Sequence, residues 1–148
     1  LAAIYASALL FFGAPGQLFG GWAADRYTPR RFLVVASAGM VASMLSLLLF
    51  PSALGAVGFL FIYGVFFFGH QPTMTTLLSS ITPSGLMGMA YGVMFFFAFG
   101  LGSVSTTIAG YLADNFSLEA VFWIMGVFAF LTFLISLVIA RVIKQKKD

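Results

Sequence analysis

The sequence contains no cysteine and only one histidine among its 148 residues. The absence of cysteine excludes a disulfide framework, a thiolate metal site and a thiol nucleophile. It also means that the sequence gives no indication of whether the protein lies in an oxidising or a reducing compartment. Charged residues make up only 7% of the chain, against about 25% in an ordinary soluble domain, whereas 61% are hydrophobic. This composition excludes a globular fold with a conventional polar surface and indicates that lipid is the solvent of most of the chain.

The groups needed for catalysis are also missing. The sequence has no paired intramembrane carboxylates, no HExxH motif and no nucleophile elbow. With a single histidine, neither acid–base hydrolysis nor a metal site has the side chains it needs. We therefore predict no enzymatic activity, no metal site and no cofactor. The net charge of +3 does not predict nucleic-acid binding, because the basic residues lie beside apolar segments rather than on one broad face.

The few charges are confined to three clusters. They occupy residues 25–31, 114–119 and 141–148, and no Asp, Glu, Lys or Arg occurs from Phe32 to Ala113. A charge at the bilayer centre costs about 2.5 to 3.5 kcal/mol even on lenient insertion scales, so the clusters mark where the hydrocarbon ends. The charge-free run is long enough for three crossings of about 20 residues each.

Glycine, proline and charge divide the chain into five expected membrane-spanning helices. Helices are favoured because the runs lack the alternating polarity and short strand length of a barrel. The predicted fold class is thus an all-α membrane protein, a partial helical bundle over residues 1–148. Its expected spans are 2–24, 32–50, 54–80, 86–112 and 119–141.

This span count makes a prediction about orientation. Four spans separate Arg31 from Arg141, so the first basic cluster and the basic tail with Lys144, Lys146 and Lys147 fall on the same side. The positive-inside rule makes that side, and the C-terminus, cytoplasmic, in a plasma (inner) membrane. Asp114 and Glu119 then lie outside. Leu1 would also begin outside, within apolar sequence, and we therefore expect that an N-terminal part of a larger protein is missing.

Polar groups at mid-membrane depth are the candidate substrate contacts. These are Gln17, Tyr63, His70 and Gln71. Residues 63, 67, 70 and 74 share one face of a helix, a stripe typical of a cavity lining. The alternative, that His70 hydrogen-bonds a neighbouring helix and stays neutral, carries equal weight. Pro72 removes one backbone donor at the same level, as in the broken helices of transporters.

Small residues at four-residue spacing indicate close helix packing. The main stripe is Gly102, Thr106 and Gly110 in the fourth segment. Gly16 and Gly20 have the same four-residue spacing in the first segment. Static packing and a sliding surface between two moving halves are both compatible with such stripes.

The first charged loop carries a recognisable motif. It reads Gly-Trp-Ala-Ala-Asp-Arg-Tyr-Thr-Pro-Arg-Arg over residues 21–31 and resembles the G-x-x-x-D-R-x-G-R-R loop of the major facilitator superfamily. Thr28 and Pro29 replace the single glycine that usually precedes the basic pair, an apparent insertion of one residue. The alternative is a solvated loop with the usual inside charge.

The resemblance implies that the five segments correspond to helices eight to twelve of a twelve-helix transporter, with the N-terminal half and one further helix missing. Residues 87–123 are most similar to the fosmidomycin-resistance-like drug exporters. By this resemblance the protein works as a secondary transporter by alternating access, with protons and a small-molecule substrate as partners in the lipid bilayer. His70 and Tyr63 would face substrate. The cytoplasmic gate loop would comprise Gly21, Asp25, Arg26, Arg30 and Arg31. The competing hypothesis is a non-transporting assembly subunit or an inert truncated remnant.

Overall fold

The computed structural model describes residues 2–50 and 52–143, and over these residues every regular element is a helix. This confirms the all-helical class. The elements are α1 (Ala2–Arg26), α2 (Pro29–Leu49), α3 (Ala53–Ile81), η1 (Ser84–Leu86), α4 (Met87–Phe95), η2 (Phe96–Leu101), α5 (Gly102–Asn115) and α6 (Leu118–Val142). Four stretches of the described chain are long and apolar enough to cross a membrane: Pro29–Leu49, Ala53–Ile81, Ser84–Asn115 and Leu118–Val142.

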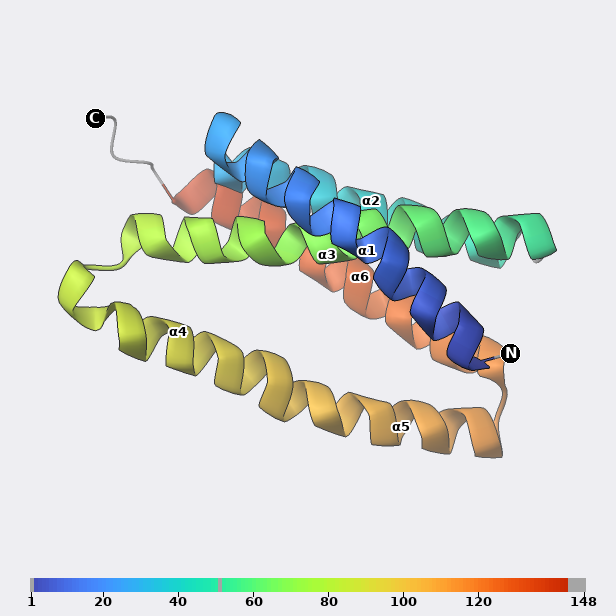
Figure 1. The fold of residues 1–148 in the computed structure, drawn as a ribbon. Coiled ribbons are helices and arrows are strands. Elements are labelled where there is room, and N and C mark those ends of the chain that lie inside the picture. The colour runs from blue at the N-terminus through green and yellow to red at the C-terminus, as the bar shows by residue number, and fades with distance from the viewer. Residues whose placement is uncertain (1, 51, 144–148) are drawn as a thin grey trace.

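The helices form a bundle with one long arm beside it (Figure 1). Helix α3 packs against α1 and α2, and α2 packs in turn against α6. The stretch from Ser84 to Asn115, which we call the arm, runs alongside as a separate rod that makes few contacts with the bundle. None of its residues, all of which the structure describes, is buried.

The up-and-down order gives the bundle two chemically different ends. One end, which we call the basic end, holds the α1–α2 connection and the end of α6 (Figure 1). It carries Asp25 and four arginines: Arg26, Arg30, Arg31 and Arg141. The opposite, acidic end carries Asp114 and Glu119 at the α5–α6 connection. The tail lysines Lys144, Lys146 and Lys147 lie outside the described residues.

Helices α1 and α3 approach closely because glycines line their contact. A Cβ added at Gly16 would lie 2.5 Å from the carbonyl oxygen of Val65, and one at Gly20 would collide with the backbone of Gly69. Close backbone approach of this kind substitutes for the hydrophobic effect, which drives no association between helices in lipid. The predicted small residues of the first segment therefore do pack, and α3 is their partner.

The buried side chains gather on α2 and on the helices around it. Leu33 and Met44 are almost fully enclosed, and Met40 and Met44 form a core cluster with Phe59 of α3 and Ala129 of α6. The buried hydroxyls of α2 are satisfied within the helix: Ser37 donates to the Leu33 carbonyl at 2.8 Å. Among the described residues no buried side-chain nitrogen or oxygen lacks a hydrogen-bond partner, as an apolar core requires.

The arm changes its helical geometry near its middle. Residues Phe96–Leu101 form a π-helical segment between the α-helices α4 and α5. Helix α3, in contrast, is continuous through Pro72. The structure therefore shows no break of α3 at Pro72, and the departure from α-helical geometry in the arm occurs in an apolar run without proline. Tyr91 connects the arm to the bundle by donating a hydrogen bond to the Thr75 carbonyl at 3.2 Å.

Candidate functional site

A cavity of about 340 Å³ lies where the arm approaches the bundle, among α2, α3, α5 and α6. His70 and Tyr63 both line it, so the structure brings together two of the four predicted substrate contacts. The remaining lining residues are Met40, Phe67, Ser105, Met125, Phe128, Ala129 and Thr132. The lining combines an imidazole, a phenol and two hydroxyls with aromatic and thioether groups. Such a mixture of apolar walls and few polar groups is typical of small-molecule sites.

Tyr63 is positioned by aromatic neighbours on its own helix. Its ring stacks on Phe59 at 5.1 Å and on Phe67 at 5.4 Å between centroids. Spacings of four residues place these rings one above another along α3. Met74, which shares the predicted stripe, does not line the cavity.

A second, more apolar cavity of about 530 Å³ continues along the contact between α5 and α6. It shares Ser105, Met125 and Phe128 with the cavity at His70. The two form a crevice between the arm and α6, because both lie on the side of the bundle that the arm faces. Sequence reasoning did not find the α6 wall, since Met125, Phe128 and Thr132 are indistinguishable by composition from lipid-facing positions.

The other two predicted contacts lie elsewhere. Gln17 of α1 and Gln71 of α3 are exposed, and the Gln17 Nε2 lies 3.5 Å from the Gln71 Oε1, a long hydrogen bond. This pair spans the α1–α3 contact. Gln71 follows His70 directly, yet one residue turns the helix by about 100° and points the two side chains in different directions.

The motif loop at the basic end makes an unexpected contact. The Arg30 guanidinium Nη1 donates a hydrogen bond of 2.7 Å to the carbonyl oxygen of Ile143, directly after α6. Asp25, Arg26 and Arg31 are exposed, and within residues 2–50 and 52–143 none of them has a side-chain hydrogen bond or ion pair. Within these residues Asp25 therefore forms no ion pair with an arginine of the motif loop.

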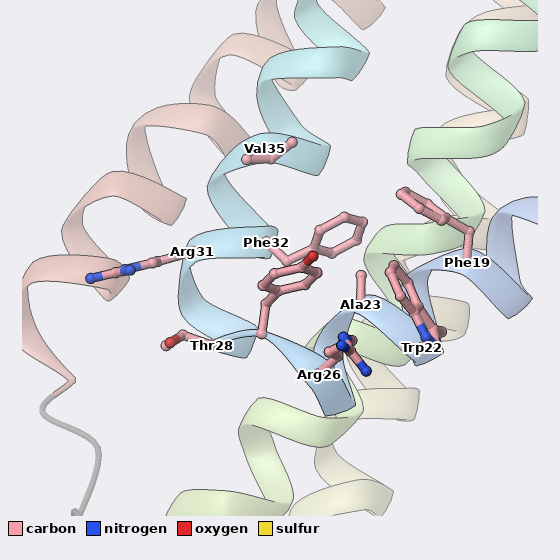
Figure 2. A pocket seen from close by; sticks show the side chains of 9 residues that line it. Phe19, Trp22, Ala23, Arg26, Thr28, Arg31, Phe32 and Val35 are labelled. Carbon is pink, nitrogen blue, oxygen red and sulfur yellow. The ribbon is translucent and has the colours of Figure 1, made fainter.

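The same loop encloses a pocket of about 600 Å³ (Figure 2). Arg26 lies beside the aromatic side chains of the pocket, whereas the Arg31 side chain extends away from them on the other side of α2 (Figure 2). Trp22 stacks with Phe19 and meets Tyr27 edge-on. The lining is Phe19, Trp22, Ala23, Arg26, Tyr27, Thr28, Arg31, Phe32 and Val35. Sequence reasoning missed this pocket, although the aromatic residues on both sides of Asp25 were a signal for it.

The predicted packing stripe of the arm makes no close helix contact at its glycines, and its Thr106 lines the apolar cavity between α5 and α6. A Cβ added at Gly102 or Gly110 would meet no atom within 4 Å, and Thr106 is exposed. Gly21 of the motif is likewise in open space. A packing role for these positions remains a prediction.

Comparison with known proteins yields one family and two relatives. The family model described as Major Facilitator Superfamily matches residues 1–107. The chain is 30% identical over 144 residues to "Multidrug resistance protein MdtG" of Dickeya zeae, which covers 91% of this chain and 33% of that protein. It is 28% identical over 148 residues to "Gentisate transporter" of Corynebacterium glutamicum, at 97% and 32% coverage. The chain thus spans about a third of the length of these curated relatives. No solved structure matches it significantly.

Proposed function

Because the chain belongs to the major facilitator superfamily, we propose that it is part of a secondary transporter that moves a small molecule across a membrane by alternating access. It is an integral membrane protein by family and by its apolar helices. In this proposal further helices complete the translocation path, and residues 2–143 supply one wall of it. Export of a drug or metabolite, driven by protons that move down their gradient, is the favoured mode.

The cavity at His70 is the observation that carries the proposal. His70 lies within a stretch of sequence that contains no Asp, Glu, Lys or Arg. Titratable side chains in membrane-spanning segments are energetically costly and therefore rare, so that their presence favours a functional role. The polar groups of the cavity come from three helices: His70 and Tyr63 from α3, Ser105 from α5 and Thr132 from α6. Convergent polar groups in an otherwise apolar cavity can orient a ligand with both apolar and hydrogen-bonding parts. The two relatives are named for different substrates, so their names do not choose one.

The orientation follows from the charges. The basic end carries four arginines and the acidic end none among the described residues. We place the basic end, and with it the C-terminus, in the cytoplasm of a cell whose plasma (inner) membrane holds the protein. On this placement the motif loop with Gly21, Asp25, Arg26, Arg30 and Arg31 lies at the cytoplasmic mouth, where a gate would close.

The test is a transport assay on two polypeptides. Cells expressing the completed gene and cells expressing only these 148 residues are compared for uptake and efflux of labelled drugs and aromatic acids. Each measurement is repeated after the proton gradient is collapsed. Gradient-dependent transport by the longer protein supports the proposal. Transport by neither, with both inserted in the membrane, contradicts it and favours a non-transporting assembly subunit or an inert remnant.

A further inference from the structure

The pocket at the α1–α2 connection shares no lining residue with the cavity at His70. We propose that it binds the phosphate-bearing headgroup of an anionic phospholipid at the surface of the bilayer. The proposal rests on three features of the pocket: its depth along the bundle, its charge and its aromatic walls.

The pocket lies at the boundary between polar and apolar sequence. Arg31 is the last charged residue before the run from Phe32 to Ala113 that has none, and Phe32 and Val35 line the same pocket as Arg31. One side of the pocket is therefore cationic, whereas the other belongs to the membrane-spanning part of α2. A phospholipid has the same division between its phosphate and its acyl chains, and meets the protein at this depth.

The charge of the lining matches an anion. Arg26 and Arg31 are both among the residues that line the pocket, and no carboxylate lines it. The Arg26 guanidinium lies beside the aromatic side chains (Figure 2). Within the described chain neither guanidinium has a hydrogen-bond or ion-pair partner, whereas Arg30 between them donates to Ile143. The planar guanidinium presents several donors in a geometry that suits phosphate oxygens. Basic pockets among membrane helices are typical binding sites for anionic headgroups.

The aromatic walls indicate a lipid rather than a free anion. Trp22 and Tyr27 are about half exposed, at 51% and 59%, and both line the pocket with Phe19. Indole and phenol rings favour the headgroup level of a bilayer, because an apolar ring and a polar tip suit that interface. A site for a soluble phosphate would not need an open apolar wall formed by Phe19, Phe32 and Val35.

The chain offers a matched pair of reporters for a test. Its two tryptophans are Trp22, in the pocket, and Trp123, which lies near the acidic end on α6 and has a similar exposure of 54%. Trp123 lies beside Glu119, with its Nε1 3.4 Å from the Glu119 Oε1. Single-tryptophan variants Trp123→Phe and Trp22→Phe of the 148-residue chain are reconstituted in phosphatidylcholine vesicles. Quenching by brominated phosphatidylglycerol is compared with quenching by brominated phosphatidylcholine at equal mole fraction.

We expect Trp22, but not Trp123, to be quenched preferentially by the anionic lipid. Each arginine near the surface is worth about a fivefold preference, so Arg26→Gln and Arg31→Gln together should remove the preference of Trp22. Arg26→Gln and Arg31→Gln are also measured singly. The control for each single variant is Arg141→Gln, which removes one positive charge in the last turn of α6 at the same end and does not line the pocket. Circular dichroism verifies that all variants stay helical.

Four results would overturn the proposal. The first is an equal preference at Trp22 and Trp123, and the second is a preference at Trp22 that survives the double substitution. The third is loss of the preference in Arg141→Gln, which would indicate a diffuse surface charge. The fourth is loss of the preference in sodium phosphate but not in sodium chloride of equal ionic strength, which would assign the arginines to a soluble anion.

Discussion

The Arg30 guanidinium lies 2.7 Å from the carbonyl oxygen of Ile143 and joins the beginning of α2 to the end of α6, across 113 residues of sequence. The last carbonyls of a helix have no partner within the helix and carry its partial negative charge. A guanidinium at this position therefore satisfies a carbonyl and interacts favourably with the α6 dipole. One member of the basic pair thus joins α2 to α6 at this end of the bundle, while its neighbour Arg31 is among the residues that line the loop pocket.

Loss of the Arg30 side chain should loosen the end of α6. We expect Arg30→Gln to lower the free energy of unfolding in detergent by about 1 kcal/mol, because a charge-assisted bond and a dipole interaction are lost. Amide hydrogen exchange at the end of α6 should also become faster. Arg31→Gln, which removes the same charge one residue away without breaking a bond, is the control. Equal effects of the two substitutions would show that charge, not the contact, is responsible.

The α1–α3 contact should be sensitive to a single methyl group. Gly20→Ala places a Cβ against the backbone of Gly69, and such overpacking costs about 1 to 3 kcal/mol. Gly21→Ala is its matched control, because the added Cβ meets nothing within 4 Å and alanine favours a helix by up to about 1 kcal/mol. Thermal unfolding in detergent measures both. A Gly20→Ala variant as stable as Gly21→Ala would contradict the observed helix contact.

His70 should matter to transport in a way that Gln71 does not. In the completed transporter we expect His70→Gln to lower transport at least tenfold if it carries the proton, since the amide cannot titrate. The rate of the parent protein should depend on pH, because a histidine side chain can gain and lose a proton under physiological conditions, and the pH profile of the variant should be flat. Gln71→Ala, whose side chain bonds Gln17 instead, should retain both rate and profile. A His70→Gln variant with the parent profile would exclude His70 as the proton carrier.

The Asp25 carboxylate separates the gate-loop hypothesis from the solvated-loop alternative. We expect Asp25→Asn to impair transport by the completed protein while membrane insertion, measured by expression in the membrane fraction, is unchanged. Asp25 is exposed and makes no hydrogen bond within the described residues, so its removal should not affect stability. Unchanged transport would leave Asp25 as an ordinary solvated charge.

The arm glycines give opposite expectations in the two polypeptides. Gly110→Leu should leave the stability of the 148-residue chain unchanged, because the position faces open space. In the completed transporter the same substitution should reduce stability or transport, provided that a further helix packs on Gly102 and Gly110. Thermal unfolding of both purified proteins checks this. No effect in the longer protein would remove the packing role predicted for the stripe.

The fold class and the two ends of the bundle could be predicted because they depend on simple quantities. Hydropathy and charge placement established the all-helical membrane class, and the parity of the spans put the first basic cluster and Arg141 at one end. The contact of Arg30 with Ile143 now joins those regions directly. The glycines of α1 also indicated a packing surface, because regularly spaced residues without side chains allow another helix to approach closely.

The π-helical segment, the direction of the Gln71 side chain and the loop pocket could not be predicted, because they depend on local geometry that hydropathy does not describe. Phe96–Leu101 is an apolar run in which nothing distinguishes a π-helical turn from an α-helical one, yet the wider turn shifts the face of every later residue of the arm. The sequence places Gln71 at the same depth in the membrane as His70. Depth in the membrane does not determine the direction in which a side chain points around the helix axis. The loop pocket depends on how Trp22 and Tyr27 fold back on each other, which sequence spacing does not specify.

The absence of a fully buried residue from the arm has a consequence for how this chain tolerates change. None of residues 84–115 is fully buried within the described protein, so in the isolated polypeptide apolar replacements should be accepted at the positions that face away from α3 and α6. In systematic mutagenesis of the arm, the tolerated residues should therefore be those that are stable in contact with lipid. The same scan over α2 should instead select residues that fit the packed protein core, because many α2 side chains are buried. Positions of the arm at which a longer protein rejects substitutions that the short one accepts would map, residue by residue, the surface of whatever neighbour the arm acquires.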